Sequence, residues 1–112
     1  MRRGEIWWAS LPDPTGSAPG YVRPVIIIQA DEFNQSAIRT VLVAAVTKNL
    51  NLASAPGNVL LSSRSSGLPK PSVANVSQLL SVDRNFLKER IKSIDTECMR
   101  QIDDGLRLIL KL

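Results

Sequence analysis

The sequence contains no histidine, and its only cysteine is Cys98. Without histidine, the usual acid and base of neutral pH is missing, together with the Cys-His and Ser-His nucleophile systems. A zinc site is not expected either, because histidine and cysteine are the usual zinc ligands. A single cysteine forms no intramolecular disulfide. The commonest routes to hydrolytic catalysis are therefore excluded.

Metal and nucleotide motifs are also scarce. The adjacent carboxylates Asp103 and Asp104 fall on the polar side of a predicted helix, where a solvated role is expected rather than magnesium binding. Gly16 and Gly20 lie in a Pro-rich segment that no Gly-Lys-Ser follows, so a phosphate-binding loop is excluded. We expect any catalysis to need no metal and no cofactor.

Acidic residues are absent from a long stretch between Glu32 and Asp83, although the net charge of the chain is only +4. Such a stretch arises by chance when much of it is buried strand. The alternative is a face that tolerates phosphates, since one misplaced carboxylate would repel a polyanion. The basic residues of this stretch are Arg39, Lys48, Arg64 and Lys70.

No apolar run approaches the roughly 20 residues that a membrane span requires. The amino-terminal segment MRRGEIWWASL has neither the apolar core nor the cleavage site of a signal peptide. With 112 residues and 44% hydrophobic residues, the chain is long enough for one domain with one core. We expect a soluble, cytoplasmic protein with a single domain over residues 1–112 and no membrane partner.

Short β-branched and alternating segments dominate the first 94 residues. Turn-rich segments separate them at 12–20 (PDPTGSAPG), 49–57 and 63–71, and residues 31–36 and 83–89 favour single turns. Segment 72–83 alternates irregularly, which predicts a bent strand with a bulge. Strands are predicted at 4–11, 23–30, 40–48, 57–63, 72–83 and 90–94.

The carboxyl-terminal segment changes period and predicts an amphipathic helix that Asp95 caps. Gly105 lowers the stability of such a helix by about 1 kcal/mol, so we expect it to permit a close contact. Short strands followed by a helix predict a mainly β fold, a small, strongly bent sheet or open barrel. The apolar positions of the helix are Met99, Ile102, Leu106, Ile109 and Leu110.

An Arg-Pro pair, Arg23 and Pro24, stands directly before the most apolar run of the chain. Pro24 suits the first residue of a strand, and it biases Arg23 towards an extended conformation. Arg23 is thus held at the mouth of a strand. It either pairs with a surface carboxylate or takes part in chemistry, and its surroundings decide between the two.

Five segments, distributed in order from Arg3 to Leu112, form a recognisable pattern: RGEIWWASLPDPTGS, RPVIIIQADEFN, VLVAAVTKN, GLPKPSVANVSQLLSVD and DDGLRLILKL. With these segments the chain resembles the MazF/PemK family of toxins over nearly its whole length. The resemblance implies an SH3-like barrel with a terminal helix and a homodimer. It also implies a sequence-specific, metal-independent endoribonuclease that cleaves single-stranded RNA, and a cognate antitoxin that neutralises it.

The resemblance implies catalytic roles for Arg23 and Thr47. A fixed guanidinium receives two phosphoryl oxygens while a ribose 2'-hydroxyl attacks its own phosphate, and a threonine hydroxyl contributes position. This route leaves 2',3'-cyclic phosphate and 5'-hydroxyl ends on the cleaved mRNA. The expected RNA-binding residues are Lys48, Arg64, Lys70, Asn75 and Gln78.

One position departs from the pattern of the family. Many relatives have an acidic residue directly before the glutamine of the late strand, but here Ser77 precedes Gln78. Neither Asn75 nor Ser77 transfers a proton at neutral pH, so the chain relies on Arg23 and Thr47, is slower, or mainly binds. The alternatives are a non-enzymatic toxin resembling the CcdB group, which binds DNA gyrase, and a weak relative that only binds RNA or antitoxin.

Overall fold

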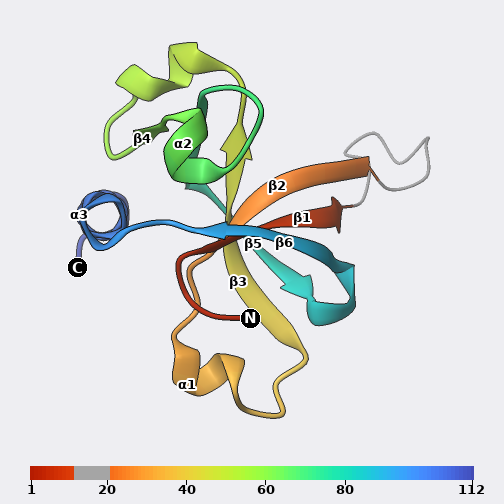
Figure 1. The fold of residues 1–112 in the computed structure, drawn as a ribbon. Coiled ribbons are helices and arrows are strands. Elements are labelled where there is room, and N and C mark those ends of the chain that lie inside the picture. The colour runs from red at the N-terminus through yellow and green to blue at the C-terminus, as the bar shows by residue number, and fades with distance from the viewer. Residues whose placement is uncertain (12–20) are drawn as a thin grey trace.

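In the described part of the chain, six strands form one antiparallel sheet that curls strongly, and a helix near the carboxyl terminus closes one side (Figure 1). The computed structural model describes residues 1–11 and 21–112, so the predicted loop at 12–20 lies outside the described residues. The spatial order of the strands is β4-β5-β3-β2-β1-β6. The strands are β1 (Glu5–Leu11), β2 (Tyr21–Ile27), β3 (Thr40–Thr47), β4 (Val59–Leu61), β5 (Ser72–Asp83) and β6 (Leu87–Ser93).

Both faces of the curled sheet are covered by apolar side chains, which explains the continuous apolar run of β2. Val25 and Ile27 belong to one cluster of buried residues, whereas Ile26 and Ile28 belong to another. Successive residues of a strand point to opposite faces, so a strand buried on both faces has no polar alternation. The two clusters are called here the helix-side core, which contains Ile26, and the outer core, which contains Val25.

Strand β5 carries the predicted bulge. Its pairing with β3 shifts from Leu79 opposite Ala44 to Asn75 opposite Ala45. Residues 76–78 therefore have no partner on β3, and the strand bends there. The bulge brings Ser77 and Gln78 to the surface, where both are exposed.

The closing helix α3 (Thr96–Leu110) begins as predicted, because the Asp95 carboxylate accepts a hydrogen bond of 2.7 Å from the Cys98 backbone N–H. Ile102 and Leu106 pack into the helix-side core. The last turn differs from the prediction, since Ile109 and Leu110 are 43% and 50% exposed. Within the described part of the chain, no helix is both long enough and apolar enough to cross a bilayer.

Gly105 permits a close contact, as expected. A Cβ atom at this position would overlap the backbone carbonyl oxygen of Gly57, which lies in the turn before β4. Gly57 itself has a φ of +84°, in the left-handed region that favours glycine. The helix therefore packs directly on backbone, which brings α3 against β4 and β5.

Several boundaries differ from the sequence-based expectation. Pro24 does not begin its strand, because β2 starts at Tyr21 and Pro24 pairs with Trp8 of β1. The pairing of β2 with β3 stops at Val25, next to the proline that has no N–H to contribute. Strand β6 likewise begins at Leu87 rather than at 90.

In the described residues, short helical turns occupy four of the connections between strands. A one-turn helix, α2, was not expected in the segment 63–71: it starts where the Ser62 hydroxyl accepts from the Ser65 N–H and ends at Gly67, whose φ is 75°. Segment 49–57, also predicted as loop, contains a 3-10 helix. The turns are α1 (Asp31–Asn34), η1 (Leu50–Ser54), α2 (Ser63–Ser66) and η2 (Arg84–Phe86).

Candidate functional site

Arg23 and Thr47 lie just beyond the end of the β2–β3 ladder. Val25 and Ala45 are the last registered pair, and Arg23 and Thr47 each lie two residues beyond it. Because side chains two residues apart share a face of a strand, Arg23 and Thr47 belong to the same face of the sheet. Asn75 belongs to this face as well, since it is the registered partner of Ala45. Three predicted site residues from three strands are thus brought together.

The Arg23 side chain is exposed, and its guanidinium carbon lies 5.4 Å from the centroid of the Tyr21 ring. Such a contact between a cation and an aromatic ring contributes about 0.5–1 kcal/mol at an exposed site. Arg23 forms no ion pair with any residue in the described ranges 1–11 and 21–112. The pairing with a surface carboxylate that the sequence left open is therefore not observed among these residues.

The Thr47 hydroxyl is held by its own chain. Its oxygen accepts a hydrogen bond of 3.1 Å from the backbone N–H of Asn49, whose side chain caps η1. An oxygen that accepts from the backbone keeps its O–H free to donate to a third group. Thr47 is half-buried at the end of β3, and the hydrogen bond from Asn49 fixes the position of its hydroxyl oxygen.

Polar side chains from the bulge of β5 extend this face. The Ser77 hydroxyl donates a hydrogen bond of 2.8 Å to the side-chain oxygen of Asn75. Gln78 is exposed in the same bulge, next to Ser77. Ser77, which stands where the resemblance leads us to expect a carboxylate, is thus a neutral hydroxyl that already donates to Asn75.

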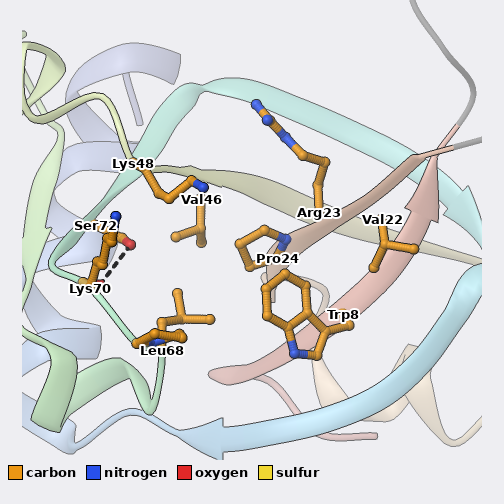
Figure 2. A pocket seen from close by; sticks show the side chains of 10 residues that line it. Trp8, Val22, Arg23, Pro24, Val46, Lys48, Leu68, Lys70 and Ser72 are labelled. Atoms are coloured by element: carbon orange, nitrogen blue, oxygen red, sulfur yellow. Dashed lines mark hydrogen bonds between the residues drawn. The ribbon is translucent and has the colours of Figure 1, made fainter.

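A cavity of about 310 Å³ opens beside Arg23 (Figure 2). It lies on the face of the sheet that carries the helix-side core, opposite to the face of Arg23 and Thr47. Trp8, Pro24 and Val46 form part of its wall, and Leu68 closes it from the segment after α2. Val46 and Leu68 are almost fully buried, at 2% and 5% exposure. Figure 2 shows the Arg23 guanidinium directed away from Trp8, so Arg23 lies at the rim of the cavity rather than inside it.

Two of the predicted RNA-binding lysines, Lys48 and Lys70, line this cavity, but Arg64 does not. Arg64 lies in α2, where its backbone carbonyl accepts a hydrogen bond from the Lys92 ammonium. No described residue of the cavity lining is acidic. Arg39, another basic residue of the acid-free stretch, is also absent from the lining, and its guanidinium forms an ion pair of 3.6 Å with the Asp83 carboxylate.

The sequence interpretation missed Tyr21 and Trp8. Tyr21 stands two residues before Arg23, and the period of a strand is the signal that places both on one face. Trp8 carries no such signal, because its contact with the cavity depends on the pairing of β1 with β2. Across the described residues, no group of three or more histidine, cysteine or acidic side chains is arranged to hold a metal ion.

Comparison with known proteins places the chain among toxins. It matches the family model described as "PemK-like, MazF-like toxin of type II toxin-antitoxin system" over residues 2–110. A curated relative from Mycobacterium tuberculosis, "Endoribonuclease MazF6", is 41% identical over 112 residues, which is 100% of this chain and 98% of the relative.

Solved structures share the fold. The MazE-MazF complex (Form-II) of Deinococcus radiodurans has a TM-score of 0.81 at 18% identity, and the match covers 100% of this chain and 96% of that chain. A mycobacterial structure described as an endoribonuclease in complex with its cognate antitoxin has a TM-score of 0.78 at 17% identity, with 100% and 96% covered. The expected fold class, a small open barrel of the MazF type with a carboxyl-terminal helix, is confirmed.

Proposed function

The chain belongs to the family of PemK-like, MazF-like toxins of type II toxin-antitoxin systems, and from this premise we propose that it is a metal-independent, sequence-specific endoribonuclease that cleaves single-stranded RNA. The curated relative that is 41% identical over the full chain is named an endoribonuclease. The observation that carries the proposal is the pair Arg23 and Thr47, which lie on one face of the sheet, each two residues beyond the last registered pair of β2 and β3. The cavity beside Arg23 is lined by basic side chains, and none of its described lining residues is acidic.

Arg23 stabilises the transition state of an in-line displacement. The ribose 2'-oxygen forms a bond to phosphorus, the bond from phosphorus to the 5'-oxygen breaks, and negative charge grows on the two non-bridging oxygens. A guanidinium donates to both oxygens through parallel N–H groups, which a point charge does not reproduce. The ring of Tyr21 restricts the guanidinium to one region, so less ordering is needed when RNA binds.

Thr47 positions the phosphate. Its oxygen accepts from Asn49, and its O–H donates to a phosphoryl oxygen on the face that it shares with Arg23. Neither side chain removes the proton of the 2'-hydroxyl at neutral pH. With Ser77 at the position of the usual acid, that proton leaves to solvent and the 5'-oxygen takes one from solvent, so the chemical step is slow.

RNA with defined ends tests this function. Purified protein is incubated with a long single-stranded RNA in EDTA, and the 5' ends and terminal phosphates of the products are mapped. The proposal requires cleavage at recurring short sequences, with 2',3'-cyclic phosphate and 5'-hydroxyl ends. Products with 5'-phosphates, or cleavage that appears only with magnesium, contradict it, and a folded protein that binds RNA without cleaving it supports the non-catalytic alternative.

We further propose that the toxin acts as a cytoplasmic homodimer. Apolar side chains at the end of α3 are exposed beside a groove of about 310 Å³ that Leu42 and Leu79 line, and dimers bury such surface. Sedimentation at micromolar concentration tests this, with Leu110→Glu as the disrupting variant. The exposed side chains at the end of α3 are Leu108, Ile109, Leu110 and Leu112.

A cognate antitoxin is the second partner that we propose. The related mycobacterial endoribonuclease was solved in complex with its own antitoxin. An acidic segment that folds on binding suits the cations around the cavity, because it meets no described carboxylate in the lining. Covering Arg23 or Lys70 with such a segment would prevent RNA from reaching the strand ends.

A further inference from the structure

The cavity beside Arg23 has walls suited to a flat apolar ring. Trp8 offers an aromatic surface, and Val46 and Leu68 are almost fully buried behind it. Bases of single-stranded RNA bind proteins by stacking on aromatic side chains and by contacts to their edges. A volume of about 310 Å³ holds one such base, whereas the sugar and phosphate remain outside.

Apart from the Ser72 hydroxyl, the polar groups of the lining side chains only donate hydrogen bonds. Lys48 and Lys70 contribute ammonium groups, and Trp8 contributes an indole N–H, none of which accepts a hydrogen bond. The Ser72 hydroxyl is 1% exposed and donates a hydrogen bond of 3.1 Å to the backbone carbonyl of Lys70. The described lining includes no carboxylate and no side-chain amide.

We propose that this cavity binds one nucleobase next to the cleaved phosphate and selects a base with a carbonyl oxygen, that is uracil, cytosine or guanine, against adenine. This assignment rests on the proposed function, because the base lies next to the cleaved phosphate only if Arg23 binds that phosphate. Lys48 or Lys70 donates to the carbonyl oxygen. Adenine has no carbonyl, and although its ring nitrogens accept hydrogen bonds, N1 and N7 each lie beside an amino group that would face an ammonium group that only donates.

The arrangement of β2 explains how base and phosphate separate. Pro24 faces the cavity with its registered partner Trp8, whereas Arg23 pairs with Ala9 of the outer core and points to the opposite face. Figure 2 shows Pro24 above the Trp8 ring and the Arg23 guanidinium beyond it. A nucleotide at this strand would have its phosphate on the Arg23 face and its base on the Trp8 face.

Binding of RNA analogues that resist cleavage tests the assignment. Hexamers of uridine, cytidine and adenosine with 2'-O-methyl groups lack the attacking hydroxyl, so their binding is measured apart from catalysis. Trp7 is replaced by phenylalanine, which leaves Trp8 as the one tryptophan. We expect the uridine and cytidine hexamers to quench Trp8 fluorescence and to bind roughly 10-fold more tightly than the adenosine hexamer.

Two double variants with equal loss of charge separate base selection from general attraction. In Lys48→Met with Lys70→Met, the preference for uridine over adenosine should disappear. In Lys88→Met with Lys111→Met, whose lysines lie outside the cavity lining, all hexamers should weaken by the same factor and the preference should remain.

Equal affinity for uridine and adenosine hexamers would overturn the proposal, and so would the absence of any hexamer binding. Hexamer binding with unchanged Trp8 fluorescence would also overturn it and would leave the cavity to a side chain of the antitoxin. The hexamer-binding experiment and the cleavage experiment test different proposals. Cleavage with equal hexamer affinities removes the cavity assignment alone, whereas selective binding without cleavage removes the catalytic proposal alone.

Discussion

The ring of Tyr21 lies beneath the guanidinium of Arg23, with 5.4 Å between the ring centroid and the guanidinium carbon. Both side chains project from one face of β2, two residues apart. An arginine at a strand end has several rotamers of similar energy, and the ring lowers the energy of one region. The contact therefore links the aromatic ring of Tyr21 to the proposed catalytic step.

We expect Tyr21→Ala to lower the single-turnover cleavage rate by roughly 2- to 5-fold, because the contact contributes about 0.5–1 kcal/mol. Tyr21→Phe keeps the ring and should retain nearly the full rate. The rates are measured with saturating RNA in EDTA. Equal rates for the alanine and phenylalanine variants would separate Tyr21 from catalysis.

Arg23→Ala should lower the rate by about 10²- to 10³-fold, as the loss of a donor to a developing oxyanion does. Arg23→Lys should recover little of this, since an ammonium does not donate to two oxygens in parallel. Thr47→Val removes one donor and should cost about 10- to 100-fold. Thermal unfolding should remain unchanged for Arg23→Ala, and an unfolded variant would mean that Arg23 serves the fold instead.

Lys70 and Arg64 make a matched pair, because both are exposed cations of the acid-free stretch but Lys70 alone lines the cavity. Lys70→Glu should weaken RNA binding and lower the slope of log affinity against log salt by about 0.7 per lost phosphate contact. Arg64→Glu should have the smaller effect. Affinity for the antitoxin is measured on the same variants, and unchanged affinity with an unchanged salt slope would remove both residues from partner binding.

Gly105→Ala should reduce the free energy of unfolding by about 1–3 kcal/mol, although alanine favours helix, because its Cβ would overlap the Gly57 carbonyl. Gln101→Ala, at an exposed position of the same helix, should change it little. Urea titrations followed by circular dichroism measure both. A Gly105→Ala protein as stable as the parent would show that α3 moves freely relative to the Gly57 turn.

Glu5 should make stability depend on acidic pH. Burial raises the pKa of the Glu5 carboxyl, but hydrogen bonds from the Arg2 N–H, the Trp7 indole and the Arg90 guanidinium outweigh burial and leave the pKa below its ordinary 4.5. A lowered pKa stabilises the fold above pH 4.5, and this contribution is lost as pH falls from there through the folded-state pKa. Glu5→Gln should therefore be less stable than the parent at pH 7.

The difference in unfolding free energy between the parent and Glu5→Gln should shrink as the pH falls below 4.5. Other carboxylates, such as Asp31, also have lowered pKa values, so the comparison between the two proteins is informative and the absolute curve is not. A difference that stays constant from pH 7 to pH 3 would contradict the assignment to the Glu5 carboxylate.

Much of the fold follows from local patterns that the sequence displays. The Asp95 cap and the spacing of Ile102 and Leu106 predict α3, because helix ends and helix faces depend on residues within a few positions of one another. Irregular alternation in 72–83 predicts the bulge for the same reason. The one-turn helix α2 escaped prediction, since a Ser-rich segment suits either a loop or a capped turn.

Pairing between strands that are distant in the sequence determined which residues lie together at the candidate site, which local patterns do not predict. The sequence by itself determined that the chain has no histidine, that an Arg-Pro pair precedes an apolar strand, and that acids are absent between Glu32 and Asp83. Only the tertiary structure decided that Arg23 and Thr47 share a face of the sheet, that Trp8 and Lys70 line one cavity while Arg64 does not, and that α3 rests on the backbone of Gly57. The reason is physical, because the register and the curl of the sheet arise from contacts among residues far apart in the chain. Local propensity does not specify which face of a strand packs against which other segment.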